Sequence, residues 1–131
     1  MVVFVDTSAF INLLDEDAGD HAAAAATWLR LLNEQATQRS TDYVRLETWA
    51  LLQARFGMDA VRKFDRSYLP VVEWLHVTEP QFAAAKTLVL SARRRGLSLV
   101  DAASFTVMRD EAIEAAFAFD RHFREQGFAL L

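Results

Sequence analysis

The chain contains no cysteine, only two prolines and four glycines in 131 residues, and no long hydrophobic run. Without cysteine it can form neither disulfide bonds nor a thiolate metal site. So little proline and glycine leaves no material for long linkers, and we expect one domain over residues 1–131. No apolar stretch approaches the roughly 18 residues that cross a membrane, and the first residues lack the pattern of a signal peptide. We therefore expect a cytoplasmic protein that does not contact a membrane.

Positive charge is also scarce, because 14 Lys and Arg stand against 18 Asp and Glu, for a formal net charge of −4. This balance disfavours a protein that is held to nucleic acid by bulk electrostatics. An acidic protein can still act on nucleic acid if metal ions hold the phosphates and a local basic rim assists. Candidates for that rim are Arg39, Arg93, Arg94, Arg95 and Arg121. The arginine run could instead only complement a helix dipole.

Short β-branched or aromatic segments alternate with longer helical patterns. We expect strands at residues 2–5, 37–40, 71–77, 116–119 and 128–131. We expect helices at residues 7–14, 21–36, 42–56, 59–68, 79–95 and 98–111. Such alternation predicts a parallel sheet that is covered on both faces. The expected fold class is α/β, a three-layer α/β/α domain with a short central parallel sheet.

Four carboxylates interrupt apolar stretches: Asp6, Glu47, Asp101 and Asp120. Asp6 and Asp120 follow predicted strands, and the other two lie near the starts of predicted helices, so all four should gather at the carboxyl edge of the sheet. Three of them have a simpler explanation when taken alone. Asp6 and Asp120 could cap the turns that follow them, and Asp101 could complete a capping box with Ser98. Glu47 has apolar helical neighbours, so an inward carboxylate there needs a partner.

Taken together, the four acids point to a metal site. Two carboxylates about 4 Å apart repel each other by about 4 kcal/mol at an effective dielectric constant near 20. A cluster of four therefore requires protons or a cation. Ligands that are all oxygen favour Mg²⁺ or Mn²⁺, and a chain with no cysteine and only three histidines is a poor candidate for zinc.

Four segments, in this order along the chain, carry a family resemblance: Asp6-Thr7-Ser8-Ala9-Phe10, Leu46-Glu47-Thr48, Leu97-Ser98-Leu99-Val100-Asp101-Ala102-Ala103-Ser104-Phe105 and Phe119-Asp120-Arg121-His122-Phe123. With them the chain resembles PIN-domain ribonucleases, and most of all the VapC-type toxins of bacterial toxin–antitoxin pairs. The resemblance covers nearly the whole chain. It implies a PIN-like domain that acts as a Mg²⁺- or Mn²⁺-dependent endoribonuclease on RNA, with one or two ions in an acidic pocket.

The resemblance also assigns roles to residues. It implies that Asp6, Glu47, Asp101 and Asp120 bind the metal, and that the hydroxyl of Thr7 or Ser8 orients Asp6 or the attacking water. Ser104 is expected to hydrogen-bond near the site. Some members carry a further acid or asparagine shortly after the fourth carboxylate, where this chain has His122 and Phe123. This departure leaves a second metal position open, and His122 is a candidate for contact with the substrate.

Two partners besides the RNA substrate follow from the resemblance. Such toxins usually form homodimers, and a cognate antitoxin silences them by inserting a basic or aromatic segment into the acidic groove. We expect interface residues among the aromatic side chains of the first helices, with Trp28, Phe56 and Phe64 as candidates.

Three other functions compete with the toxin. Asp6 could accept a phosphoryl group, but such sites need a lysine at another strand end, and Lys63 and Lys86 both lie in predicted helices. A PIN domain could also serve as a binding scaffold without activity. It could instead work in RNA processing or decay, although a chain this short favours the toxin.

Overall fold

A five-stranded parallel sheet forms the centre of the computed structural model, which describes residues 1–92 and 96–131. The strands are β1 (Val2–Val5), β2 (Thr37–Thr41), β3 (Glu73–Leu75), β4 (Ala115–Phe117) and β5 (Ala129–Leu130). Their order in the sheet is β3-β2-β1-β4-β5, and every neighbouring pair is parallel. The first strand of the chain therefore lies in the middle of the sheet.

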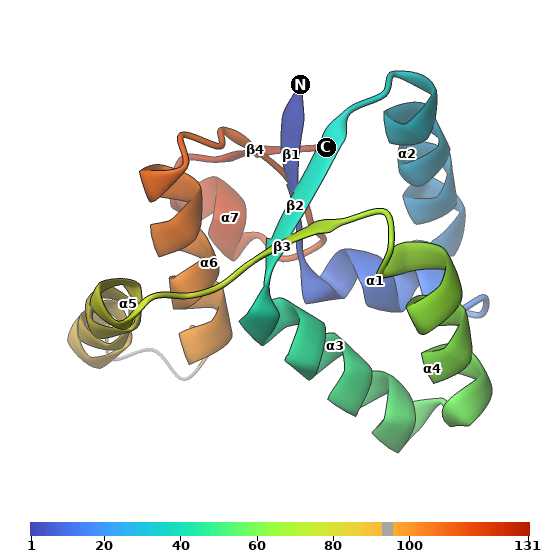
Figure 1. The fold of residues 1–131 in the computed structure, drawn as a ribbon, viewed down its shortest axis with the longest axis horizontal. Helices are drawn as coiled ribbons and strands as arrows, with labels where there is room; N and C mark the ends of the chain where they lie inside the picture. Colours follow the sequence, from blue (N-terminus) through green and yellow to red (C-terminus); the bar gives the residue numbers. More distant parts are fainter. Residues whose placement is uncertain (93–95) are drawn as a thin grey trace.

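Helices cover both faces of this sheet (Figure 1). In that view α1, α2 and α4 lie on one side of β1 and β2, and α5, α6 and α7 lie on the other. The helices are α1 (Thr7–Leu14), α2 (His21–Asn33), α3 (Asp42–Arg55), α4 (Met58–Lys63), the π-helix η1 (Phe64–Tyr68), α5 (Glu79–Ala92), α6 (Leu99–Asp110) and α7 (His122–Glu125). The expected three-layer α/β/α architecture is confirmed. No helix in the described part of the chain is long and apolar enough to span a bilayer.

Helix starts follow the capping signals in the sequence. The Thr41 hydroxyl accepts from the backbone N–H of Val44 at 3.2 Å and caps α3. The Thr78 hydroxyl accepts from the backbone N–H of Gln81 at 3.3 Å, and the Gln81 side chain accepts from the Thr78 N–H at 3.0 Å. This reciprocal pair is a capping box, and it fixes the start of α5.

Several predicted boundaries were wrong. The helix expected at residues 21–36 ends at Asn33, because Gln35 takes a left-handed conformation with φ of 54° and reverses the chain. The segment expected as one helix at 59–68 is α4 followed by the π-helix η1, and the strand expected at 71–77 is only three residues long. The predicted end of the helix at 79–95, beyond Ala92, lies outside the described residues.

One boundary error concerns the candidate site. The strand expected at 116–119 ends at Phe117, so Asp120 lies in a loop and not directly at a strand end. The cause is a change of hydrogen-bond partner, because the backbone N–H of Phe119 donates to the Ser8 hydroxyl at 2.9 Å instead of to a neighbouring strand. The loop is thereby tied to the start of α1.

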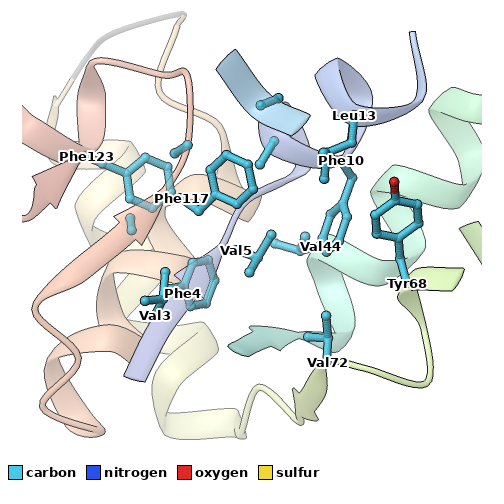
Figure 2. Close-up of a cluster of buried hydrophobic side chains, with 14 of the residues drawn as sticks. Val3, Phe4, Val5, Phe10, Leu13, Val44, Tyr68, Val72, Phe117 and Phe123 are labelled. Carbon is cyan, nitrogen blue, oxygen red and sulfur yellow. The ribbon is translucent and has the colours of Figure 1, made fainter. Parts of the chain in front are cut away.

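The core is aromatic and lies against both faces of β1 (Figure 2). The rings of Phe105 and Phe123 meet edge to face with centroids 4.9 Å apart, and Phe4 lies 6.2 Å from Phe123. Trp28 and Phe64, expected at an exposed interface, belong to this core with exposed fractions of 8% and 0%. That prediction was wrong for both.

The aromatic contacts explain why these two side chains are buried. Trp28 packs on Tyr68 at 4.9 Å, and Phe64 packs edge to face on Phe10 at 5.2 Å. Phe56, the third candidate, is 40% exposed and remains accessible.

Candidate active site

Asp6 lies at the carboxyl end of the central strand, where α1 begins. Its carboxylate oxygen Oδ2 accepts two hydrogen bonds from Ser8, one from the backbone N–H at 3.1 Å and one from the hydroxyl at 2.6 Å. Asp6 therefore caps α1, as one interpretation of the sequence held. Its other oxygen, Oδ1, is buried and has no hydrogen-bond partner in the described structure. Because a buried carboxylate oxygen is costly to leave unpaired, this atom is a candidate ligand for a cation.

Of the two hydroxyl groups considered, that of Ser8 hydrogen-bonds to the Asp6 carboxylate. Its Oγ donates to Asp6 and accepts from the backbone N–H of Phe119, so it joins the end of β1 to the loop that carries Asp120. The Thr7 hydroxyl is engaged elsewhere, because it accepts from the buried hydroxyl of Thr48 at 3.2 Å. Ser8 therefore makes the hydroxyl contact that orients Asp6, while Thr7 lines the same cavity and also joins α1 to α3.

Asp101 enters from α6 and is only 9% exposed. Ser98 caps this helix by accepting from the Asp101 backbone N–H at 3.0 Å, so the expected cap is present. Ser104, expected to hydrogen-bond near the site, is fully buried and donates to the carbonyl oxygen of Val100 at 3.0 Å. Its hydroxyl is thus hydrogen-bonded within α6, and Ser104 is not among the residues that line the acidic cavity.

Asp120 projects from the loop after β4. Its Oδ1 accepts from the backbone N–H of His122 at 2.9 Å, which makes the turn-capping interpretation correct as well. The Nδ1 atom of the same histidine lies 3.0 Å from Oδ1, although the two atoms are not aligned for a hydrogen bond. Both side chains are partly accessible, at 28% for Asp120 and 18% for His122.

All four predicted carboxylates line one cavity of about 330 Å³. Glu47 reaches it from α3 and is half-buried, so it is less enclosed than its apolar neighbours led us to expect. The convergence of the acids is visible in their electrostatics. The pKa of Asp101 is raised from 3.8 to about 8, by burial first and then by the negative charges of Asp6, Asp120 and Glu47.

Asp6 responds to the same environment. Burial is the largest cause that raises its pKa from 3.8 to about 6, and the charge of Asp120 adds to it, while the two hydrogen bonds from Ser8 oppose the rise. At neutral pH the chain alone thus keeps a proton on Asp101. Full ionisation of the cluster needs positive charge from outside the chain.

The geometry suits a divalent cation. Ligand atoms of Asp101, Asp120 and His122 all lie within 4.8 Å of one another, and the unpaired Oδ1 of Asp6 belongs to the same cavity. The donors are mainly carboxylate oxygens, which hard cations such as Mg²⁺ and Mn²⁺ prefer. His122 was expected only as a contact for substrate, and its nitrogen is also within reach of a metal.

Other residues of the cavity were missed in the sequence. Asn12 from α1 and Arg55 from α3 line it together with the acids. The available signal was helical spacing, because Asn12 follows Ser8 by four residues and Arg55 follows Glu47 by eight, which places each pair on one helix face.

Two of the five arginines expected to form a basic rim, Arg39 and Arg121, do not line the acidic cavity. Arg39 is bound to Glu73 at 2.8 Å, and Arg121 is 88% exposed with its Nε atom 3.7 Å from Glu125. Neither is among the residues that line the acidic cavity. Arg93, Arg94 and Arg95 lie outside the described residues. Among the described residues, Arg55 is the cationic side chain that lines the cavity.

A larger hollow, of about 630 Å³, lies elsewhere on α3 and is lined mostly by apolar side chains. Its one carboxylate, Asp42, is occupied, because it accepts from the backbone N–H of Val77 at 3.0 Å. Without a second acid, this hollow cannot hold a hard cation in the way the smaller cavity can.

Comparison with known proteins identifies the family. The PIN domain model matches residues 3–129. The 23S rRNA-specific endonuclease VapC20 of Mycobacterium tuberculosis is 34% identical over 128 residues, which are 97% of this chain and 95% of VapC20. The crystal structure of VapC20, described as a Sarcin-Ricin loop cleaving toxin, superposes with a TM-score of 0.82 at 32% identity and covers 98% of this chain and 97% of that one.

Two more distant structures share the fold. VapBC2 from Rickettsia felis, bound to a DNA fragment from its promoter, matches with a TM-score of 0.72 at 12% identity and covers 100% of this chain and 98% of that one. FitAcB from Neisseria gonorrhoeae matches with a TM-score of 0.70 at 13% identity, with coverages of 100% and 96%. Taken with the family model and the identity to VapC20, the chain belongs to the PIN-domain family, and within that family it is of the VapC type.

Proposed function

We propose that this chain is the toxin of a toxin–antitoxin pair and acts as a metal-dependent endoribonuclease that hydrolyses RNA phosphodiester bonds at the acidic cavity. One observation carries the proposal. Carboxylates from the end of β1, α3, α6 and the loop after β4 line one cavity, and a buried oxygen of Asp6 has no hydrogen-bond partner among the described residues. A fold does not retain such a cluster for stability, because each acid raises the cost of ionising the others.

The roles follow from position. Asp6, Asp101 and Asp120 would hold the ion with His122 as a further ligand, and Glu47 lines the same cavity from α3. When bound, Mg²⁺ or Mn²⁺ neutralises charge that develops on the phosphate and lowers the pKa of a water molecule. Ser8 fixes the orientation of Asp6 and the path of the Asp120 loop through its two hydrogen bonds. No serine, threonine or cysteine nucleophile is required.

For the substrate we propose ribosomal RNA. The support is the identity to VapC20 over nearly the full length of both chains, since that relative is a 23S rRNA-specific endonuclease. The test is to incubate metal-free protein with ribosomal and transfer RNA, with and without Mn²⁺, and to map the new ends. We expect Mn²⁺-dependent cuts in ribosomal RNA that disappear in Asp6→Asn and Asp101→Asn. Cleavage that persists in either variant would refute the assignment of the site.

We also propose an antitoxin partner and a homodimer. An acidic cavity is complementary to a basic peptide segment, and exposed apolar side chains on α2 and α3 offer contact surface, with Leu29 at 59%, Leu32 at 41% and Leu46 at 71%. Light scattering after size exclusion should give twice the monomer mass. Purification from the native host should yield a small basic partner that inhibits cleavage, and a cytoplasmic location goes with these partners.

The phosphoacceptor alternative loses support. Lys63 ends α4 and Lys86 lies within α5, and neither lines the cavity that contains Asp6. Phosphoryl transfer to Asp6 would lack the lysine that it needs.

A further inference from the structure

The acidic cavity extends beyond the four carboxylates along two helices. On α1 its lining passes from Ser8 to Asn12, and on α3 it passes from Glu47 through Leu51 to Arg55. Glu47 and Arg55 are eight residues apart on one helix face, which corresponds to about 12 Å along the axis at 1.5 Å per residue. One end of the cavity is therefore strongly acidic, and the other end carries a cation.

Arg55 is free to bind a ligand. It is exposed, and among the described residues it takes part in no ion pair, unlike Arg39 with Glu73 and Arg62 with Asp59. Glu47, the acid of the cavity on the same helix, lies about 12 Å from Arg55 along the axis and is not paired with it in the described structure. Its place in the last turn of α3 suits the helix dipole, but the dipole does not determine which face the side chain occupies.

Asn12 supplies neutral donors on the facing helix. Its Nδ2 donates to the carbonyl oxygen of Ser8 at 2.9 Å, which fixes the amide while leaving a second N–H available. The backbone carbonyl oxygen of Asn12 lies 2.9 Å from Nδ1 of His21, and this contact holds the end of α1 against the start of α2. A fixed amide and an exposed guanidinium that line the same cavity are a suitable arrangement for an anion.

We propose that Arg55 and Asn12 form a subsite for a non-scissile phosphate of the RNA backbone, one that belongs to a nucleotide next to the cleaved bond. A guanidinium binds phosphate through two parallel hydrogen bonds, and an amide N–H can add a third. Leu51 lies between the subsite and Glu47 and gives an apolar surface for the intervening sugar or base. This inference rests on the proposed ribonuclease function.

The subsite also explains how an acidic chain can hold RNA. Its net charge of −4 repels a polyanion, so the chain needs localised contacts. Metal at one end of the cavity and Arg55 at the other would each hold a phosphate, and two anchors fix the direction of the strand as well as its position. Cleavage at a defined bond requires that fixed register.

The test compares Arg55→Ala, Arg55→Lys and Asn12→Ala with Arg62→Ala, which removes the same charge from an exposed ion pair outside the cavity. The substrate is a synthetic RNA that spans the mapped cleavage site. We expect Arg55→Ala to raise KM about tenfold with kcat nearly unchanged, as for the loss of uniform binding. Arg55→Lys should recover part of the loss, and Arg62→Ala should behave as wild type.

Neutral methylphosphonate linkages, placed one at a time around the scissile bond, identify the phosphate. For the wild-type protein, kcat/KM should fall about tenfold when one neighbouring linkage is neutral, relative to unmodified RNA. For Arg55→Ala, the same neutral linkage should cause no further loss in kcat/KM. Removal of this contact should also reduce the slope of log affinity against log salt by about 0.7. Equal sensitivity of both proteins at every linkage, or an effect of Arg55→Ala no larger than that of Arg62→Ala, would overturn the subsite.

Two failures can be told apart. If wild-type protein does not cleave RNA with Mn²⁺, the proposed function fails. If it cleaves but Arg55 has no effect, only the subsite fails. Binding of the same RNA by Asp101→Asn, with and without Arg55→Ala, gives a readout without turnover, and a tenfold difference in Kd between these two proteins is expected.

Discussion

Replacement of Asp101 by asparagine should stabilise the metal-free protein while abolishing its activity. Asparagine keeps the size of the side chain and the backbone N–H that Ser98 caps, but it removes a buried negative charge. The difference between a pKa of about 8 in the folded chain and the ordinary value of 3.8 corresponds to at most about 6 kcal/mol. Because neighbouring acids can take up protons themselves, we expect a gain of a few kcal/mol.

The pH dependence gives the sign of this effect. Below pH 3.8 Asp101 is protonated in both the folded and the unfolded chain, and its charge costs nothing. Between pH 3.8 and about 8 the folded chain binds more protons than the unfolded one, so the stability of the wild type falls as pH rises. Above about pH 8 Asp101 is ionised in both states, and the loss of folding stability that it causes no longer changes with pH. The advantage of Asp101→Asn should therefore grow from pH 4 to pH 8 and then stay constant.

Urea denaturation in EDTA, at several pH values between 4 and 9, measures this difference. Mn²⁺ should narrow the difference between variant and wild type, because an ion at 100 times its Kd stabilises the folded wild type by about 2.7 kcal/mol. The variant lacks a ligand and should gain much less. If Asp101→Asn is no more stable than wild type at pH 9 without metal, burial of Asp101 and its repulsion by the other acids do not destabilise the folded chain.

Three further predictions concern the support of the site and the core. Ser8→Ala removes the hydroxyl that joins Asp6 to the Phe119 N–H, so it should destabilise the fold by about 1–3 kcal/mol in urea denaturation and also reduce cleavage. Thr48→Val loses one buried hydroxyl pair and should cost about 1 kcal/mol while leaving kcat close to wild type. Phe123→Ala empties the centre of an aromatic cluster and should cost about 3–5 kcal/mol, read from the same assay, and a cost below 1 kcal/mol would contradict the packing described here.

The fold class and the four carboxylates could be predicted from the sequence because both follow from local rules. Strand–helix alternation implies a parallel sheet, and the ends of parallel strands share an edge. Ser98, Thr41 and Thr78 each cap a helix through contacts within three residues, so their effects are visible in a short window of sequence. The family resemblance rested on the same local motifs and is confirmed.

What could not be predicted depends on contacts between distant segments. The Ser8 hydroxyl bonds to a backbone group 111 residues away, and this bond ends β4 earlier than its apolar pattern suggests. Trp28 and Phe64 were wrongly predicted to be exposed, because the sequence of a helix does not show whether the face that carries an apolar residue packs on the core or meets solvent. Arg55 was overlooked because its importance comes from the cavity that it lines and not from its neighbours in sequence.

The order of the strands has a consequence for synthesis on the ribosome. Among the five strands of the sheet β1 is made first and becomes its centre, and one of its two partners, β4, is made more than 100 residues later. Until β4 pairs with β1, Asp120 does not lie near Asp6. The Ser8 hydroxyl also cannot yet accept its hydrogen bond from the backbone N–H of Phe119. A nascent chain thus carries three of the acids but no assembled centre. The acidic centre is complete only after β4 and the loop that carries Asp120 have been made and have packed against β1.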